Sequence, residues 1–295
     1  MPIPEHVGVY GGGRMGAGIA HVVLLTGARV VVIETDETAA ESARKRVRTS
    51  LSRAADRNLL GEPIDSVLER LSGATEASAL ATTDLVIEAV PESFALKATV
   101  LRTIQAAAPA AHLATNTSSL SVSQLAEELE RPENLIGLHF FNPVPASELV
   151  EIVVGPRTRD ELVRHAQDWT RDLGKTAITV TDAPGFASSR LGVAIALEAM
   201  RMVEEGVASA TDIDLAMTLG YRHPTGPLKT TDIVGLDVRL AIAEHLEREL
   251  GPRFAPPELL RQMVRDGEVG RKAGQGFYSW PTGTASTGGA PHGTS

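Results

Sequence analysis

The sequence predicts an α/β protein in which an N-terminal, Rossmann-like, doubly wound sheet with a helical excursion precedes an all-α C-terminal domain. Three observations support this prediction. Short β-rich apolar runs alternate with longer amphipathic stretches in the N-terminal part, as in βαβ units with a parallel sheet. The first apolar run leads into a glycine cluster, and after Asp182 only helical spacing continues.

Length and composition exclude several classes of protein. The chain has 295 residues, 43% of them hydrophobic and 22% charged, which is ordinary for a globular protein and allows two domains. Without cysteine the chain has no disulfide, thiolate nucleophile or cysteine-ligated zinc or iron–sulfur cluster, and we identify no metal-binding pattern. The net charge of −9 opposes general nucleic-acid binding. No stretch indicates a membrane span or a secretory signal, so we expect a cytoplasmic protein.

The N-terminal part contains apolar runs rich in Val, Ile and Leu, which suits strands buried on both faces. We expect strands at residues 6–10, 29–34, 85–89, 112–115, 135–140, 148–153 and 177–180. Residues 37–72 have helical spacing throughout, more than one crossover helix needs. The sequence therefore predicts a helical excursion that protrudes from the sheet.

The C-terminal part has helical spacing without intervening strands. We expect helices at residues 188–206, 211–219, 236–250 and 258–265. Gly206, Gly220 and Gly251 stand where these helices would end, in accord with the preference for glycine after a helix. The predicted domains are residues 1–182 and 183–280, and the Gly-, Ser-, Thr- and Pro-rich residues 281–295 are expected to form a disordered tail.

A glycine motif between the first strand and the first helix indicates a dinucleotide site. Gly11 permits a tight turn, Gly13 lets the backbone approach a pyrophosphate, and Gly16 lets the helix pack on the strand. The second strand ends in Glu34, whose carboxylate would bind ribose hydroxyls and favour NAD over NADP, although Arg14 leaves room for a 2′-phosphate. The alternative is a tight turn without a ligand.

Polar residues follow two later strands and indicate a catalytic site. Ser118 follows the 112–115 run, and His139 ends the 135–140 run, so both would lie at the carboxyl edge of a parallel sheet. Histidine is the natural general base near neutral pH, and a carboxylate on its other ring nitrogen would fix its tautomer. Glu151 is the candidate partner. His139 could equally be a structural residue of the strand.

Several motifs occur in one order along the chain and together point to a known family. They are Gly11–Gly16, Asp84-Leu85-Val86-Ile87-Glu88-Ala89-Val90-Pro91-Glu92, Asn116–Leu120, Leu138–Pro145, Pro184-Gly185-Phe186, Pro224-Thr225-Gly226-Pro227 with Gly235-Leu236-Asp237, and Gly274-Gln275-Gly276-Phe277-Tyr278. On these residues the chain resembles the short-chain L-3-hydroxyacyl-CoA dehydrogenase family, including the bacterial 3-hydroxybutyryl-CoA dehydrogenases, over nearly everything to Trp280.

The resemblance implies an NAD-dependent oxidation of a 3-hydroxyacyl thioester, or the reverse reduction, in fatty-acid metabolism. It implies His139 as general base, Glu151 as its support and Ser118 as a hydrogen-bond partner of the reacting oxygen. It also implies a homodimer, with the helical domain contributing to the substrate cleft and to dimerisation. The implied NAD contacts are Gly11, Gly12, Gly13, Arg14, Met15, Gly16, Glu34, Glu92, Lys97, Ser118, Asn142 and Lys272. Alternatively, Lys97 is a solvated helix residue and Asn142 only holds the turn at Pro143.

Two departures from the family pattern bear on the substrate. Ser189 stands where the family carries an asparagine that contacts substrate, which predicts a bound water or a larger or more polar group there. Ser50 and Arg57 match the family's residues for the CoA phosphates, but Asp56 interrupts the basic run. An acyl-carrier-protein thioester or a free hydroxy acid is therefore an alternative substrate. A further alternative is a non-catalytic NAD-binding protein.

Overall fold

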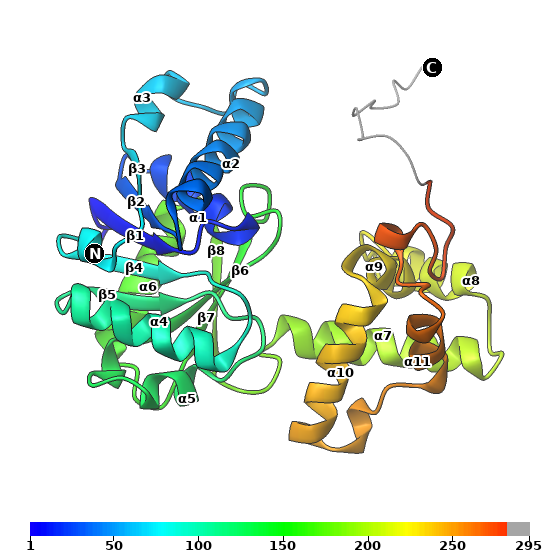
Figure 1. The fold of residues 1–295 in the computed structure, drawn as a ribbon. Coiled ribbons are helices and arrows are strands. Elements are labelled where there is room, and N and C mark those ends of the chain that lie inside the picture. The colour runs from blue at the N-terminus through cyan, green and yellow to red at the C-terminus, as the bar shows by residue number, and fades with distance from the viewer. Residues whose placement is uncertain (282–295) are drawn as a thin grey trace. The chain divides into compact units, whose positions relative to one another are not determined.

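A computed structural model describes residues 1–281. The chain divides into two compact units, which separate between Ala187 and Ser188 (Figure 1). Apart from Pro281, the predicted tail lies outside the described residues. In the described part, no helix is both long enough and apolar enough to cross a membrane.

The first unit is built on one eight-stranded sheet with the strand order β3-β2-β1-β4-β5-β6-β7-β8. Strands β1 to β6 are mutually parallel, β7 pairs antiparallel with β6, and β8 pairs parallel with β7. The strands are β1 (His6–Tyr10), β2 (Arg29–Ile33), β3 (Leu71–Ala74), β4 (Leu85–Glu88), β5 (His112–Thr115), β6 (Leu135–Phe140), β7 (Leu149–Val154) and β8 (Thr176–Thr181). The predicted doubly wound α/β class is confirmed.

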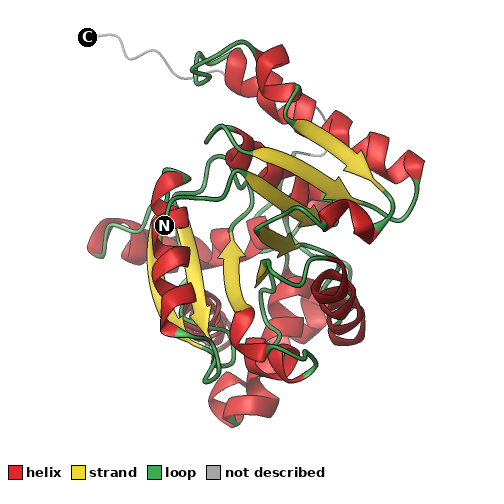
Figure 2. Ribbon diagram, turned by 90° about the vertical axis from the view of Figure 1, so that its left-hand side faces the viewer, coloured by secondary structure: helices red, strands yellow, loops and turns green. Residues whose placement is uncertain are grey.

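Helices cover both faces of this sheet (Figure 2). They are α1 (Arg14–Leu24), α2 (Glu37–Ala55), α3 (Ile64–Leu68), α4 (Phe94–Ala107), α5 (Val122–Glu127) and α6 (Asp160–Asp172). One buried cluster joins the sheet to α1, α2 and α6, and a second cluster joins its other face to α4 and α5. Burial on both faces explains why the strand sequences are continuous apolar runs.

The helical excursion differs from the prediction. The expectation of helix throughout residues 37–72 was wrong, because α2 ends at Ala55 and the segment closes with the edge strand β3. Asn58 has a left-handed backbone with φ 56°, and Pro63 precedes α3, so the helix is interrupted twice. The excursion itself is confirmed: α2 and α3 project beyond the sheet at the top of Figure 1.

The second unit is helical, as predicted. It consists of α7 (Ser188–Glu204), α8 (Ala210–Leu215) with a π-helical turn (Ala216–Gly220), α9 (Pro227–Val234), α10 (Leu236–Leu250) and α11 (Glu258–Arg265). Gly206 and Gly251 end helices with positive φ, as expected for glycine. Helix α9 was not predicted; it begins directly after Gly226 with a proline at its first position, a favoured arrangement.

Candidate active site

A cavity of about 1070 Å³ opens at the carboxyl edge of the parallel strands. Its walls come from the segments that follow β1, β2, β4, β5 and β6, which contribute Gly13, Glu34, Glu92, Ser118 and Phe141 respectively. Ligands of open parallel sheets bind at this edge. The structure therefore brings together most of the residues that the sequence singled out in the first unit.

The glycine loop between β1 and α1 is shaped by close contacts. Gly11 has φ 95°, and its amide donates to the Ile33 carbonyl over 2.9 Å. A Cβ on Gly16 would lie 1.8 Å from the Gly11 carbonyl oxygen, so only glycine lets α1 start this close to the loop. A Cβ on Gly12 would lie 2.3 Å from that of Ala43, a packing role that the sequence did not reveal.

These residues fit a bound dinucleotide. A Cβ on Gly13 would meet no atom within 4 Å, so the backbone at the start of α1 borders open space. The first amides of a helix and its dipole favour phosphate at such a position. Glu34 accepts a hydrogen bond from the Gly12 amide over 2.7 Å, which holds its carboxylate at the end of β2 beside the cavity. Arg14 and Met15 also line the cavity.

A histidine and a glutamate form a buried pair on two adjacent strands. His139 of β6 lies directly opposite Glu151 of the antiparallel strand β7, and His139 Nδ1 lies 2.7 Å from Glu151 Oε2. The histidine is 7% exposed and the glutamate 0%. Glu151 Oε1 also accepts a hydrogen bond from the Ala187 amide over 3.1 Å. The carboxylate is thus held by main chain on one side and orients the imidazole on the other.

Two phenyl rings flank the imidazole. The ring centroid of Phe141 lies 4.4 Å from that of His139, and the Phe186 centroid lies 5.7 Å away. Phe140, the last residue of β6, is a core residue with 2% exposure. Phe141 follows the strand and lines the cavity.

Glu92 holds the segment that carries Ser118. Its Oε1 accepts hydrogen bonds from the backbone amide and the hydroxyl of Ser118, over 2.9 and 3.1 Å, and from Thr117 and Ser119. Burial by itself would raise the pKa of Glu92, but the Lys97 charge and these hydrogen bonds lower it below its usual value. Glu92 is therefore an anion that fixes the Ser118 hydroxyl.

Lys97 is not a solvated helix residue, because its side chain is 1% exposed. Its Nζ donates to Glu88 Oε1 over 2.7 Å and to the Val90 carbonyl over 3.1 Å, and it lies 3.5 Å from Glu92 Oε2. The sequence reasoning missed Glu88 as part of this network. A glutamate at the end of a buried strand was the available signal, since a buried charge needs a partner.

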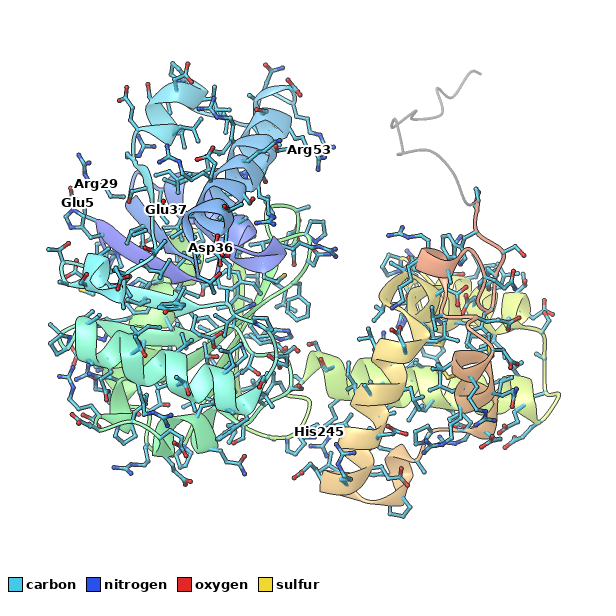
Figure 3. The ribbon with its side chains drawn as sticks, in the orientation of Figure 1. Glu5, Arg29, Asp36, Glu37, Arg53 and His245 are labelled. Atoms are coloured by element: carbon cyan, nitrogen blue, oxygen red, sulfur yellow. The ribbon has the colours of Figure 1, made fainter. Side chains whose placement is uncertain are left out.

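A second cavity, of about 660 Å³, lies between α1, α2 and the loop after β6. Its lining contains four basic residues: Arg14, Lys45, Arg46 and Arg53. Arg53, near the end of α2, is labelled in Figure 3. Ser50 also lines it, with its Oγ 2.8 Å from His21 Nδ1. We call this the basic cavity. Arg57 is exposed beyond the end of α2 and is not part of its lining.

The remaining predicted site residues are divided between the two units. Asn142 lines both cavities. Ser189 and Lys272 belong to the helical unit, where Ser189 is half-buried in the first turn of α7. Lys272 Nζ forms an ion pair of 2.6 Å with Asp237 Oδ2.

A Rossmann-like sheet, a glycine loop at a helix N-terminus and a buried His–Glu pair beside the same cavity define a dinucleotide-dependent oxidoreductase. Residues 6–183 match the family model described as 3-hydroxyacyl-CoA dehydrogenase, NAD binding domain. Residues 185–280 match the model for the C-terminal domain of that enzyme. The chain belongs to the 3-hydroxyacyl-CoA dehydrogenase family, whose members are NAD-dependent.

Relatives of similar length agree. The chain is 40% identical over 275 residues to a probable 3-hydroxybutyryl-CoA dehydrogenase of Deinococcus radiodurans, covering 92% of this chain and 99% of the relative. It is 37% identical to the mitochondrial hydroxyacyl-coenzyme A dehydrogenase of Sus scrofa, covering 94% and 91%. The crystal structure of (S)-3-hydroxybutyryl-CoA dehydrogenase from Ralstonia eutropha superposes with a TM-score of 0.91 at 38% identity, covering 94% and 99%.

Proposed function

We propose that the site interconverts a 3-hydroxyacyl-CoA and its 3-oxoacyl-CoA, with His139 as the general base. The observation that carries this proposal is the buried His139–Glu151 pair, 2.7 Å apart, on the wall of the cavity that also contains the glycine loop and Ser118. A secondary alcohol can lose its hydride only as its proton departs, so base and cofactor have to flank one carbon.

The contact between His139 and Glu151 assigns a role to each of the two side chains. Because Glu151 binds Nδ1, His139 uses Nε2 to accept the hydroxyl proton in oxidation and to return it in reduction. Glu151 keeps the imidazole in one tautomer and stabilises the imidazolium that forms. Ser118 binds the reacting oxygen by turning its single hydroxyl proton from Glu92 to that oxygen, while the Ser118 amide keeps its hydrogen bond to Glu92. NAD, when bound, supplies the hydride acceptor.

The NAD contacts follow from the lining of the larger cavity. Residues 11–16 bind the pyrophosphate through backbone amides, and Glu34 binds the ribose hydroxyls and repels a 2′-phosphate. Asn142 and Ser118 line the end of the cavity that contains His139. Buried Lys97 acts through Glu92, whose Oε2 lies 3.5 Å from its Nζ, and Lys272 of the helical unit stays a predicted contact.

The basic cavity is proposed to bind the phosphates of CoA. Ser50 and four cations line it, and Arg57 adds a further charge beyond the end of α2. The alternative substrate is an acyl-carrier-protein thioester, whose acidic surface would meet the same basic helix. Ser189, shorter than the asparagine of the family, leaves room for a water or for a more polar acyl group.

We also propose a homodimer formed through the helical unit. Its exposed apolar residues include Leu191, Leu219 and Tyr221, which are 63%, 76% and 76% exposed, and covering them with a second copy would be favourable. Sedimentation should show a species of twice the chain mass, and a monomer at all concentrations would contradict the proposal. Cytoplasmic location and a place in fatty-acid metabolism stay predictions.

Absorbance of NADH tests the proposal directly. We expect rapid loss of NADH with acetoacetyl-CoA, slow turnover with NADPH, and a kcat lowered about 10²- to 10⁴-fold in His139→Gln. His6→Gln, at the opposite end of the strands, is the matched control and should keep full activity. Turnover only with an acetoacetyl carrier-protein thioester would select the alternative substrate. Unchanged activity of His139→Gln would remove the general base.

A further inference from the structure

A short loop separates the two cavities of the first unit. We call residues 142–147, which follow β6, the partition loop. Asn142 lines both the larger cavity, which contains the glycine loop and His139, and the basic cavity. Pro143, Val144 and Pro145 line only the basic cavity. A shift of this loop would therefore alter both cavities at once.

The loop makes few hydrogen bonds of its own. The amides of Ala146 and Ser147 both donate to the Pro143 carbonyl over 3.0 Å. The Val144 side chain is buried against α1, where a Cβ on Gly18 would lie 2.8 Å from the Val144 Cβ. One edge of the loop is thus packed, while the carbonyls of Val144 and Ser147 point to a different partner.

That partner is Lys175, at the junction of α6 and β8. Its Nζ donates to the Val144 carbonyl over 2.7 Å and to the Ser147 carbonyl over 2.6 Å. Its own amide donates to the Thr170 carbonyl over 3.0 Å, and the next residue already belongs to β8. The ammonium therefore extends from a main chain that is fixed on both sides.

Lys175 is unusual among the lysines of the first unit. Within residues 1–281 it forms no ion pair with a carboxylate, and it is half-buried. Burial lowers its pKa, so the cation is held at a cost in desolvation. Charge-assisted hydrogen bonds to two carbonyls of one loop are the compensation.

We infer that Lys175 is a positioning residue for the reaction. Its ammonium fixes the partition loop and thereby sets the wall shared by the larger cavity and the basic cavity. The inference rests on the proposed function for the use of the basic cavity. The Lys175 ammonium binds two carbonyls of the partition loop rather than a side chain of the catalytic site. Its loss should therefore act on binding more than on the chemical step.

A nearby histidine supplies an independent readout. Burial first, and the charge of Lys175 second, lower the pKa of His21 to about 4. His21 in turn contacts Ser50 of the basic cavity. Removing the charge of Lys175 should raise the pKa of His21, which ¹⁵N NMR of the imidazole measures, whereas mere loosening of a distant surface would leave it unchanged.

The test compares Lys175→Met, which keeps the aliphatic stem, with Lys175→Arg, which keeps charge and donors. Exposed Lys229→Met of the helical unit is the control. For Lys175→Met we expect the KM for NADH and the KM for acetoacetyl-CoA each to rise about tenfold, with kcat changed by less than about twofold. Lys175→Arg should recover most of both KM values. If Lys175→Met does not fold, Lys175→Gln, which keeps one donor group, takes its place.

Two results would overturn the inference. One is unchanged KM for both ligands in Lys175→Met, including the case in which only its melting temperature falls. The other is a fall in kcat with both KM values intact. Fluorescence titration with NADH separates this inference from the proposed function, because it needs no turnover. If wild type binds NADH but does not reduce acetoacetyl-CoA, the proposed function fails, and weaker NADH binding by Lys175→Met still supports the role of Lys175.

Discussion

His21 should make the stability of the protein depend on pH between neutrality and pH 5. It lies on α1 with 2% exposure, and its pKa falls from 6.5 to about 4, first because it is buried and second because Lys175 is nearby. Replacement by glutamine keeps a polar side chain that can reach Ser50 but cannot titrate. The contribution of His21 can therefore be measured by comparing wild type with His21→Gln at two pH values.

The sign follows from the depressed pKa. Between pH 6.5 and 4 the unfolded chain binds a proton at His21 and the folded chain does not. The stabilisation is therefore fully present above the unfolded pKa and is lost as the pH falls towards the folded pKa. The full difference corresponds to about 3 kcal/mol, and about 2 kcal/mol of it should be lost between pH 7 and pH 5.

Urea unfolding of both proteins at pH 7 and pH 5 measures this contribution. Other groups also titrate in this range, such as His112, whose pKa is lowered by burial and then by the charges of Arg159 and His165. Their effect is common to both proteins and cancels in the difference. We expect wild type to lose about 2 kcal/mol more than His21→Gln. An equal loss in the two proteins would refute a neutral, buried His21.

Three further predictions concern stability. Lys97→Met leaves Glu88 buried at 0% exposure without its cation and should lower the free energy of unfolding in urea by about 3–5 kcal/mol. Adding Glu88→Gln should recover part of this loss, and an unchanged stability of Lys97→Met would contradict the ion pair. Gly16→Ala should lower the melting temperature sharply because its Cβ meets the Gly11 carbonyl, whereas Gly13→Ala, whose Cβ meets nothing within 4 Å, should melt like wild type. Tyr278→Phe removes a hydrogen bond of 2.8 Å to Asp214 and should destabilise the protein by about 1 kcal/mol in the same assay, and a gain in stability would argue against that bond.

Local patterns predicted most of the sheet and the glycine loop, because β1, β2 and β6 are short apolar runs bounded by turn residues. The edge strand β3 escaped notice because Leu71-Ser72-Gly73-Ala74 has one large apolar side chain and pairs only with β2. An edge strand has little burial to mark its sequence. Helix α9 was missed because its sequence lacks the clear apolar spacing that marks α11, a helix of the same length.

The candidate site was predictable only where chemistry and strand ends coincide, as at Ser118 and His139. The parts that were missed depend on contacts between distant segments. Lys97 has the spacing of a surface lysine, and only the packing of α4 over β4 buries it against Glu88. Likewise, nothing local to Lys175 or His21 shows that their side chains approach the partition loop and Ser50, because side-chain partners across elements are set by the tertiary fold.

The reversed direction of β7 makes the His139–Glu151 pair a product of strand register. The two residues face each other in the antiparallel ladder, and a slip of one residue would turn Glu151 to the opposite face of the sheet. Insertions in the loop between β6 and β7 can leave this register intact, whereas a single residue added within either strand cannot. Backbone hydrogen bonds of the sheet therefore control the spacing of base and carboxylate, independently of the composition of the partition loop that joins the two strands.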